Sequence, residues 1–85
     1  AMIDEAVAQG FTRAVATDLV VGTMRGSATL LHETGETPTS ARYAVTSPGG
    51  ATAQAIAALE EGGIRALMAR GMRAAAQASR KMEER

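Results

Sequence analysis

The chain has 85 residues with nine basic and nine acidic side chains, so its formal net charge at pH 7 is zero. Zero net charge argues against a general nucleic-acid binder, and the lack of cysteine excludes disulfides and thiolate metal sites. A domain this small, with one Phe, one Tyr and no Trp, buries little apolar area, so we expect it to gain stability by forming oligomers.

The first predicted helix covers residues 1–8, where Ile3 and Val7 share a face and Gly10 follows as a C-terminal stop. Nothing in the sequence caps its start, which suggests that the chain was cut inside a longer helix. Phe11 lies in the short connection that follows, and we expect its side chain to be buried there.

A long helix is predicted from Arg13 to about Thr34, with Thr12 as its N-cap and Gly35 as its stop. Its apolar residues are too widely spread for one face, so neighbours are expected on more than one side. Gly22 and Gly26 lie four residues apart inside it. An interior glycine costs about 1 kcal/mol relative to alanine, so this pair suggests that another segment crosses closely there.

Three further helices complete the predicted fold. Thr37 and Pro38 give a start signal for a short helix that ends near Val45. The next helix is predicted over Thr52–Glu61, and the last over Ile64–Glu83, which has apolar and small residues at three- and four-residue steps. The predicted fold class is therefore all-α, a helical bundle of about four to five helices.

The stretch Val45–Glu60, VTSPGGATAQAIAALE, predicts a turn that opens a helix. Ser47 before proline is pushed out of the helical region, and the two glycines after the proline permit close approach to the backbone. A helix N-terminus offers unpaired N–H groups and a partial positive charge, so this turn is a candidate anion site, with the Thr52 hydroxyl as donor or acceptor. The alternative is a plain turn between helices in which Thr52 is the N-cap.

This stretch is similar to the signature of pyrroline-5-carboxylate reductase: Thr-Ser-Pro-Gly-Gly-x-Thr, then Ala-Ile, then Leu-Glu. The flanking segments VGTMRGSATLLHETGETP and EEGGIRALMARGMRAAAQASRKM resemble the neighbouring helices of that family, so the resemblance covers nearly the whole chain. It implies that residues 1–85 are a C-terminal dimerisation and substrate-binding domain that forms an interlocked homodimer, with oligomers of dimers in some members. It also implies that the family's N-terminal dinucleotide-binding domain is absent from this chain.

The resemblance also implies a reaction and a substrate site. The family reduces 1-pyrroline-5-carboxylate to L-proline with NADPH or NADH, the last step of proline synthesis. By resemblance, the backbone amides of Gly49, Gly50 and Ala51 hold the substrate carboxylate. Thr52 would face the ring nitrogen or the carboxylate, and Ser47 completes the substrate-binding set.

Catalytic and cofactor motifs are not found elsewhere in the sequence. No nucleophile–base pair presents itself, and no GxGxxG follows a strand, so we expect the isolated chain to bind no dinucleotide or metal and to be inactive. A lone histidine, His32, is expected at the surface. Two alternatives remain: a stand-alone helical homodimerisation module without catalytic activity, and a domain of another reductase that acts on a related imine.

Charge is distributed unevenly along the chain. Residues 1–63 hold three basic and seven acidic side chains, whereas residues 64–85 hold six basic and two acidic ones. Because no aromatic residue interleaves with the arginines, we interpret this as a solvated helix face and expect no nucleic-acid or membrane partner. The lack of cysteine, of a long apolar run and of a signal segment predicts a cytoplasmic protein.

Overall fold

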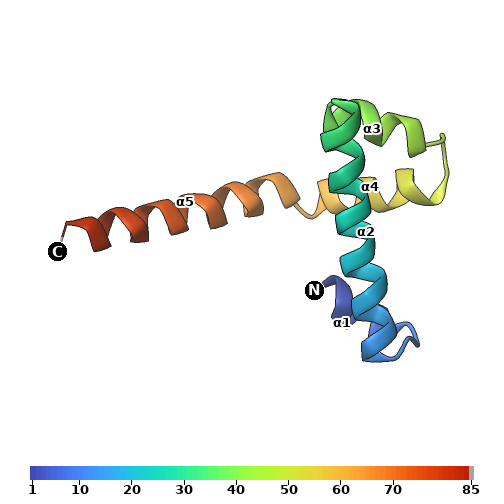
Figure 1. Cartoon of the computed structure of the whole chain (residues 1–85), viewed down its shortest axis with the longest axis horizontal. Coiled ribbons are helices and arrows are strands. Elements are labelled where there is room, and N and C mark those ends of the chain that lie inside the picture. The colour runs from blue at the N-terminus through green and yellow to red at the C-terminus, as the bar shows by residue number, and fades with distance from the viewer. Residues whose placement is uncertain (85) are drawn as a thin grey trace. The chain divides into compact units, whose positions relative to one another are not determined.

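The structure, a computed structural model, describes residues 1–84, and within them the chain is all-α with no strand. The helices, shown in Figure 1, are α1 (Met2–Ala8), α2 (Arg13–Thr34), α3 (Pro38–Val45), α4 (Ala51–Glu61) and α5 (Ile64–Glu83). The all-α prediction is confirmed, and every helix boundary lies within one residue of the expected one. The chain forms two compact units, one up to Tyr43 and one from Ala44 onward, which divide near the end of α3.

In the first unit, α1 reverses into α2 through a Schellman turn. The Phe11 N–H donates to the Ala6 carbonyl at 3.2 Å, and the Gly10 N–H donates to the Val7 carbonyl at 3.0 Å. The prediction that Phe11 is buried is wrong, because 47% of its surface is exposed. The seven-residue α1 is too short to cover a side chain that lies in the connection at the edge of the helix pair.

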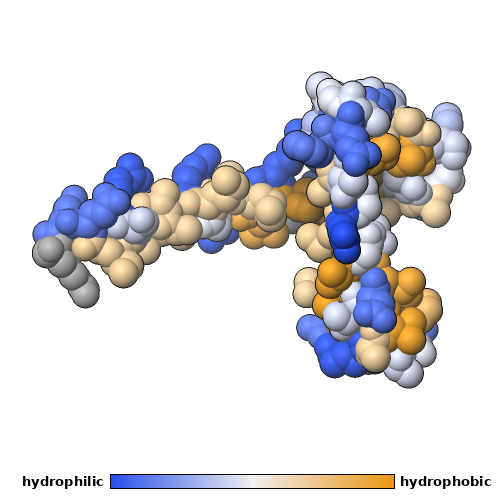
Figure 2. Space-filling model, in the orientation of Figure 1, coloured by the Kyte–Doolittle hydropathy of each residue, from blue (hydrophilic) through white to orange (hydrophobic). Residues whose placement is uncertain are grey.

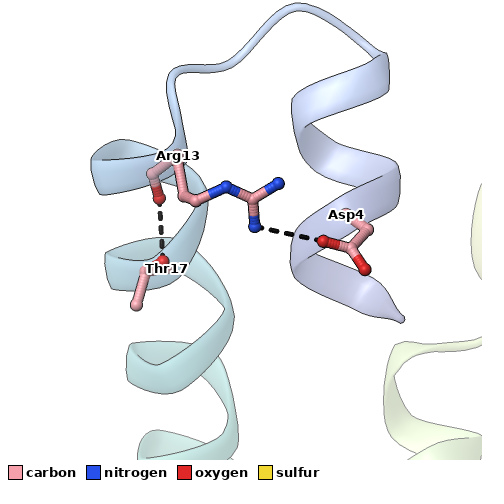
Figure 3. Close-up of polar contacts among 3 residues, drawn as sticks. All are labelled: Asp4, Arg13 and Thr17. Atoms are coloured by element: carbon pink, nitrogen blue, oxygen red, sulfur yellow. Dashed lines mark hydrogen bonds and ion pairs between the residues drawn. The ribbon is translucent and has the colours of Figure 1, made fainter.

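The start of α2 is held by side chains from both helices. Thr12 is the N-cap, as predicted, and its Oγ1 accepts from the Val15 N–H at 3.2 Å. Figure 3 shows the Arg13 guanidinium reaching the Asp4 carboxylate of α1 at 3.1 Å, while the Thr17 hydroxyl donates to the Arg13 carbonyl at 2.8 Å. Both charged side chains are mostly exposed, so the ion pair contributes about 0–1 kcal/mol and mainly fixes orientation.

The passage from α2 into α3 follows the predicted signals. Gly35 ends α2 with a φ of 70°, and its N–H donates to the Leu31 carbonyl at 3.0 Å. Thr37 then caps α3, because its Oγ1 accepts from the Ser40 N–H at 3.1 Å. The chain therefore leaves α2 and enters α3 within four residues.

In the second unit, α4 and α5 are joined at a pair of glycines. Gly63 has a φ of 81°, a left-handed conformation that costs an L side chain about 1–2 kcal/mol, and its N–H donates to the Glu60 carbonyl at 3.1 Å. The Arg65 Nε lies 2.9 and 3.0 Å from the two carboxylate oxygens of Glu60, so an ion pair spans the joint. From this joint α5 extends away from α4 (Figure 1).

Burial within the described chain is very low. Ala16 is the one buried residue among residues 1–84. Figure 2 shows that α5 has hydrophilic residues along one side and apolar residues along the other. Large apolar side chains that remain about half exposed or more include Met2, Val15, Leu19, Met24, Leu30, Leu67, Met68, Met72 and Met82.

Candidate functional site

The candidate site begins with a tight turn before α4. The Gly50 N–H donates to the Ser47 carbonyl at 3.0 Å, which closes a four-residue β-turn. Pro48 occupies the second position and Gly49, with a φ of 71°, the third. This combination is typical of a type II turn, in which the third residue needs a positive φ. The Pro-Gly-Gly sequence therefore fixes how the chain enters α4.

The first turn of α4 presents backbone donors. Gly50 is the N-cap, with φ −78° and ψ 176°, and the first bond of the helix runs from the Gln54 N–H to the Gly50 carbonyl at 3.1 Å. The N–H groups of Ala51, Thr52 and Ala53 precede that bond, so they have no partner within the helix. These three N–H donors, together with the positive end of the helix dipole, are suited to bind an anion.

Thr52 is the second residue of α4, so the prediction that it could be the N-cap is wrong, whereas a plain turn without a ligand stays an alternative. Its side chain is half-buried. Within residues 1–84 its hydroxyl takes part in no hydrogen bond. A hydroxyl at this position is free to donate to or accept from a molecule held at the helix N-terminus.

Gly50 lets the Ser47 side chain approach the backbone closely. A Cβ added to Gly50 would lie 2.7 Å from the Ser47 Oγ and 3.3 Å from the Ser47 carbonyl oxygen. The first distance is too short for a carbon–oxygen contact, so any side chain at this position would displace the Ser47 hydroxyl. Glycine therefore keeps that hydroxyl beside the start of α4.

All five residues expected at the site lie in one turn and the first turn of a helix. Within this group the structure shifts the set of donors, because the Gly50 N–H is engaged in the turn. Of the three amides expected to hold the carboxylate, only that of Gly50 is engaged within residues 1–84, and the amides of Thr52 and Ala53 at the start of α4 are further free donors. Ala53 was not among the expected residues, because the expected amides were taken from the family resemblance; the rule that the first three helical amides are unpaired identifies it.

Residues 1–84 also bear on two other kinds of site, for a dinucleotide and for a metal ion. A dinucleotide site of the usual kind needs a strand that leads into a glycine-rich helix start, and residues 1–84 contain no strand, so they do not fit the cofactor. No group of three or more His, Cys, Asp or Glu side chains within these residues is arranged to hold a metal ion. Likewise, no helix within them is both long and apolar enough to cross a membrane.

A family model described as pyrroline-5-carboxylate reductase dimerisation matches residues 1–82. The chain belongs to this family. The reductase of Corynebacterium melassecola is 42% identical over 82 residues, which cover 96% of this chain and 30% of the relative. The Delta-1-pyrroline-5-carboxylate reductase kk1I of Curvularia clavata is 41% identical over 95% of this chain and 26% of its own length. The Escherichia coli reductase is 39% identical over 84 residues, which cover 99% of this chain and 31% of the relative.

These matches confirm the family resemblance noted from the sequence. The chain spans between a quarter and a third of the length of these reductases, and what it matches is their dimerisation part. Membership of a dimerisation family also gives a reason for the low burial, because apolar side chains that are exposed in one chain are available to a second.

Proposed function

We propose that this chain is the dimerisation and substrate-binding domain of a reductase that converts 1-pyrroline-5-carboxylate to L-proline with NADPH or NADH. The observation that carries the proposal is the turn at Ser47–Gly50 opening into three unpaired amides, in a chain of this family. The absence of cysteine is in keeping with a reducing compartment such as the cytoplasm.

The substrate carboxylate is bound at the start of α4 in this proposal. Its oxygens accept hydrogen bonds from the amides of Ala51, Thr52 and Ala53, and the helix dipole favours the negative charge. A hydrogen bond to a charged group contributes about 1.5–3 kcal/mol, so two or three of them suffice to orient a small ligand.

The hydroxyl groups of Ser47 and Thr52 would orient the substrate once its carboxylate is bound. Thr52 lies within the same helical turn as the amides, and Ser47 lies against Gly50 at the entrance. With the carboxylate fixed, the Thr52 hydroxyl would form a hydrogen bond with the ring nitrogen or the carboxylate and so orient the imine for reduction. The nicotinamide cofactor of the complete reductase would supply the hydride.

A homodimer is the second part of the proposal. Most apolar side chains remain exposed within each unit, and a domain of this size with one buried residue among those described needs a partner to gain a core. Dimers that associate further are compatible with the same surfaces. A stand-alone dimerisation module would share these features but would not need the Ser47–Thr52 site.

Replacing Thr52 with valine in the complete reductase tests the site. Valine keeps the shape and removes the hydroxyl, so we expect kcat/KM for the imine substrate to fall about 10- to 100-fold, as loss of one hydrogen bond to a charged or reacting group predicts. Thr39→Val is a matched control, because Thr39 is the second residue of α3 as Thr52 is of α4. Equal kcat/KM in both variants would contradict the proposed site.

A further inference from the structure

The chain contains two prolines, Pro38 and Pro48, and each lies at or near the start of a helix. Pro38 is the first residue of α3, and Thr37 caps that helix, because its Oγ1 accepts from a backbone N–H of the first turn at 3.1 Å. Pro48 lies three residues before α4, whose N-cap Gly50 has no side chain to bind the first amides. One of the first amides of α3 is therefore bonded to a side chain, whereas the start of α4 has no such cap.

Pro48 acts on the turn before α4 through its backbone. Its ring fixes φ at about −65°, which is the value needed at the second position of a type II turn. The side chain of Pro48 is exposed, so it contributes little to packing. What this proline supplies is a restriction on the chain that Ser47 and Gly50 close with a hydrogen bond of 3.0 Å.

Gly49 supplies the second special angle of the turn, a φ of 71°. A Cβ at this position would meet no atom within 4 Å, so space is not the reason for the glycine. The left-handed conformation is unfavourable for alanine and is tolerated better by asparagine. The backbone angle is therefore the property for which a glycine is needed here.

Closing this turn sets two features of the α4 start at once. It engages the Gly50 N–H, and it leaves the Ser47 Oγ 2.7 Å from the place that a Gly50 Cβ would take. The turn also leads directly into Ala51, the first residue of α4. All of these atoms belong to the compact unit that begins at Ala44, so their arrangement is set within one unit. Opening the turn would release the Gly50 N–H and move the Ser47 hydroxyl away from the start of α4.

We infer that Pro48 and Gly49 are positioning residues for the imine substrate, which act by holding the turn closed while their side chains take no part in binding. The inference rests on the proposed function of the Ser47–Thr52 site. A protein whose binding-competent conformation is only partly populated binds its ligand more weakly by that fraction. Loosening the turn should therefore raise KM for the imine and leave kcat, measured at saturation, nearly unchanged.

Pro48→Ala in the complete reductase tests this role. We expect KM for the imine to rise about 2- to 5-fold, the factor that corresponds to the loss of one proline's restriction on the backbone. Both kcat and KM for the nicotinamide cofactor should change less than about twofold. Pro38→Ala is the matched control, because it removes the chain's other proline from a helix start that has a side-chain cap. Equal values of KM for the imine in the two variants would overturn the role of Pro48.

Two substitutions of Gly49 separate its backbone angle from its N–H group, because both keep the N–H. Gly49→Ala should raise KM for the imine about 5- to 30-fold, since alanine disfavours a φ of 71°. Gly49→Asn should restore at least about threefold of that loss, because asparagine adopts positive φ more readily. Equal increases in the two variants would overturn the role of the angle. If Gly49→Ala does not fold, the comparison of Pro48→Ala with Pro38→Ala decides the inference.

Thr52→Val, measured in the same assays, distinguishes the possible failures. If neither Thr52→Val nor Pro48→Ala differs from its control in kcat/KM, the proposed substrate site fails and this inference fails with it. If Thr52→Val lowers kcat/KM but Pro48→Ala does not raise KM, only this inference is overturned. Tm is measured for each variant, and the kinetics are run well below it. A lowered Tm with unchanged KM for the imine would show that Pro48 serves the fold alone.

Discussion

A single missing Cβ decides where the Ser47 hydroxyl lies. The 2.7 Å distance from the position that a Gly50 Cβ would take to the Ser47 Oγ is shorter than any ordinary contact, whereas the φ of Gly50 is one that every residue can adopt. Glycine is therefore needed at this position for space and not for backbone freedom. At Gly49 the reverse holds, because its φ is 71° and nothing lies near its Cβ position.

We expect Gly50→Ala to raise KM for the imine substrate of the complete reductase roughly 5- to 20-fold, by displacing the Ser47 hydroxyl from the start of α4. The KM for the nicotinamide cofactor should change less than about twofold. The same substitution in a Ser47→Ala background should have a smaller effect, because the two changes act on one group. Fully additive effects in steady-state kinetics would show that Gly50 acts independently of Ser47.

The turn and the helix start at Ser47–Thr52 could be predicted from the sequence, whereas the binding of a substrate there stays a prediction. Pro-Gly-Gly before a helical pattern indicated a turn and an anion site, and the structure places those residues together. Which amides are free depended on a hydrogen bond inside the turn, between Gly50 and Ser47, that spacing does not reveal. The exposure of Phe11 was missed for a similar reason, because it depends on how much of the connection a short helix covers.

The positions of the helices and of their ends could be predicted from capping and stop residues in the sequence. Thr12 and Thr37 cap the helices for which they were assigned, and Gly35 ends α2. These caps depend on a few neighbouring residues, so the sequence specifies them without reference to the rest of the fold.

The joint between α4 and α5 provides a stability prediction at this scale. Gly63→Ala should destabilise the protein by about 1–2 kcal/mol, since an L side chain disfavours a φ of 81°. Gly62→Ala is the matched control, because Gly62 has a φ of −75° and a Cβ there meets its nearest atom at 3.4 Å. Chemical denaturation should show a change of less than about 0.5 kcal/mol for the control. Equal losses would contradict a left-handed Gly63.

On the scale of the whole molecule, stability and association are coupled. One buried alanine in the described chain cannot offset the conformational entropy lost on ordering more than about 80 residues, so the folded chain depends on what covers its apolar faces. The composition already pointed this way, because aromatic residues are nearly absent. The sequence alone could not say which faces are left open, since that depends on how α1 packs against α2.

The melting temperature of the isolated chain should therefore depend on its concentration. For a dimer that unfolds to monomers, we expect Tm to rise by several degrees for each tenfold increase in concentration, as mass action requires. Circular dichroism at chain concentrations of about 1, 10 and 100 μM would measure this, with sedimentation equilibrium giving the mass. A Tm that does not change, together with the mass of one chain, would contradict the homodimer.

The single left-handed residue at the start of α5 also has a mechanical consequence. α5 has 20 residues, so at 1.5 Å per residue it is about 30 Å long. A rotation of about 10° at Gly63 would displace its far end by about 5 Å, while the start of α4, with Ser47 and Thr52, would not move. The Glu60–Arg65 ion pair is exposed and weak, so it resists such a rotation only slightly. A small change in the backbone angles of Gly63 is therefore amplified into a large displacement at the C-terminal end of α5.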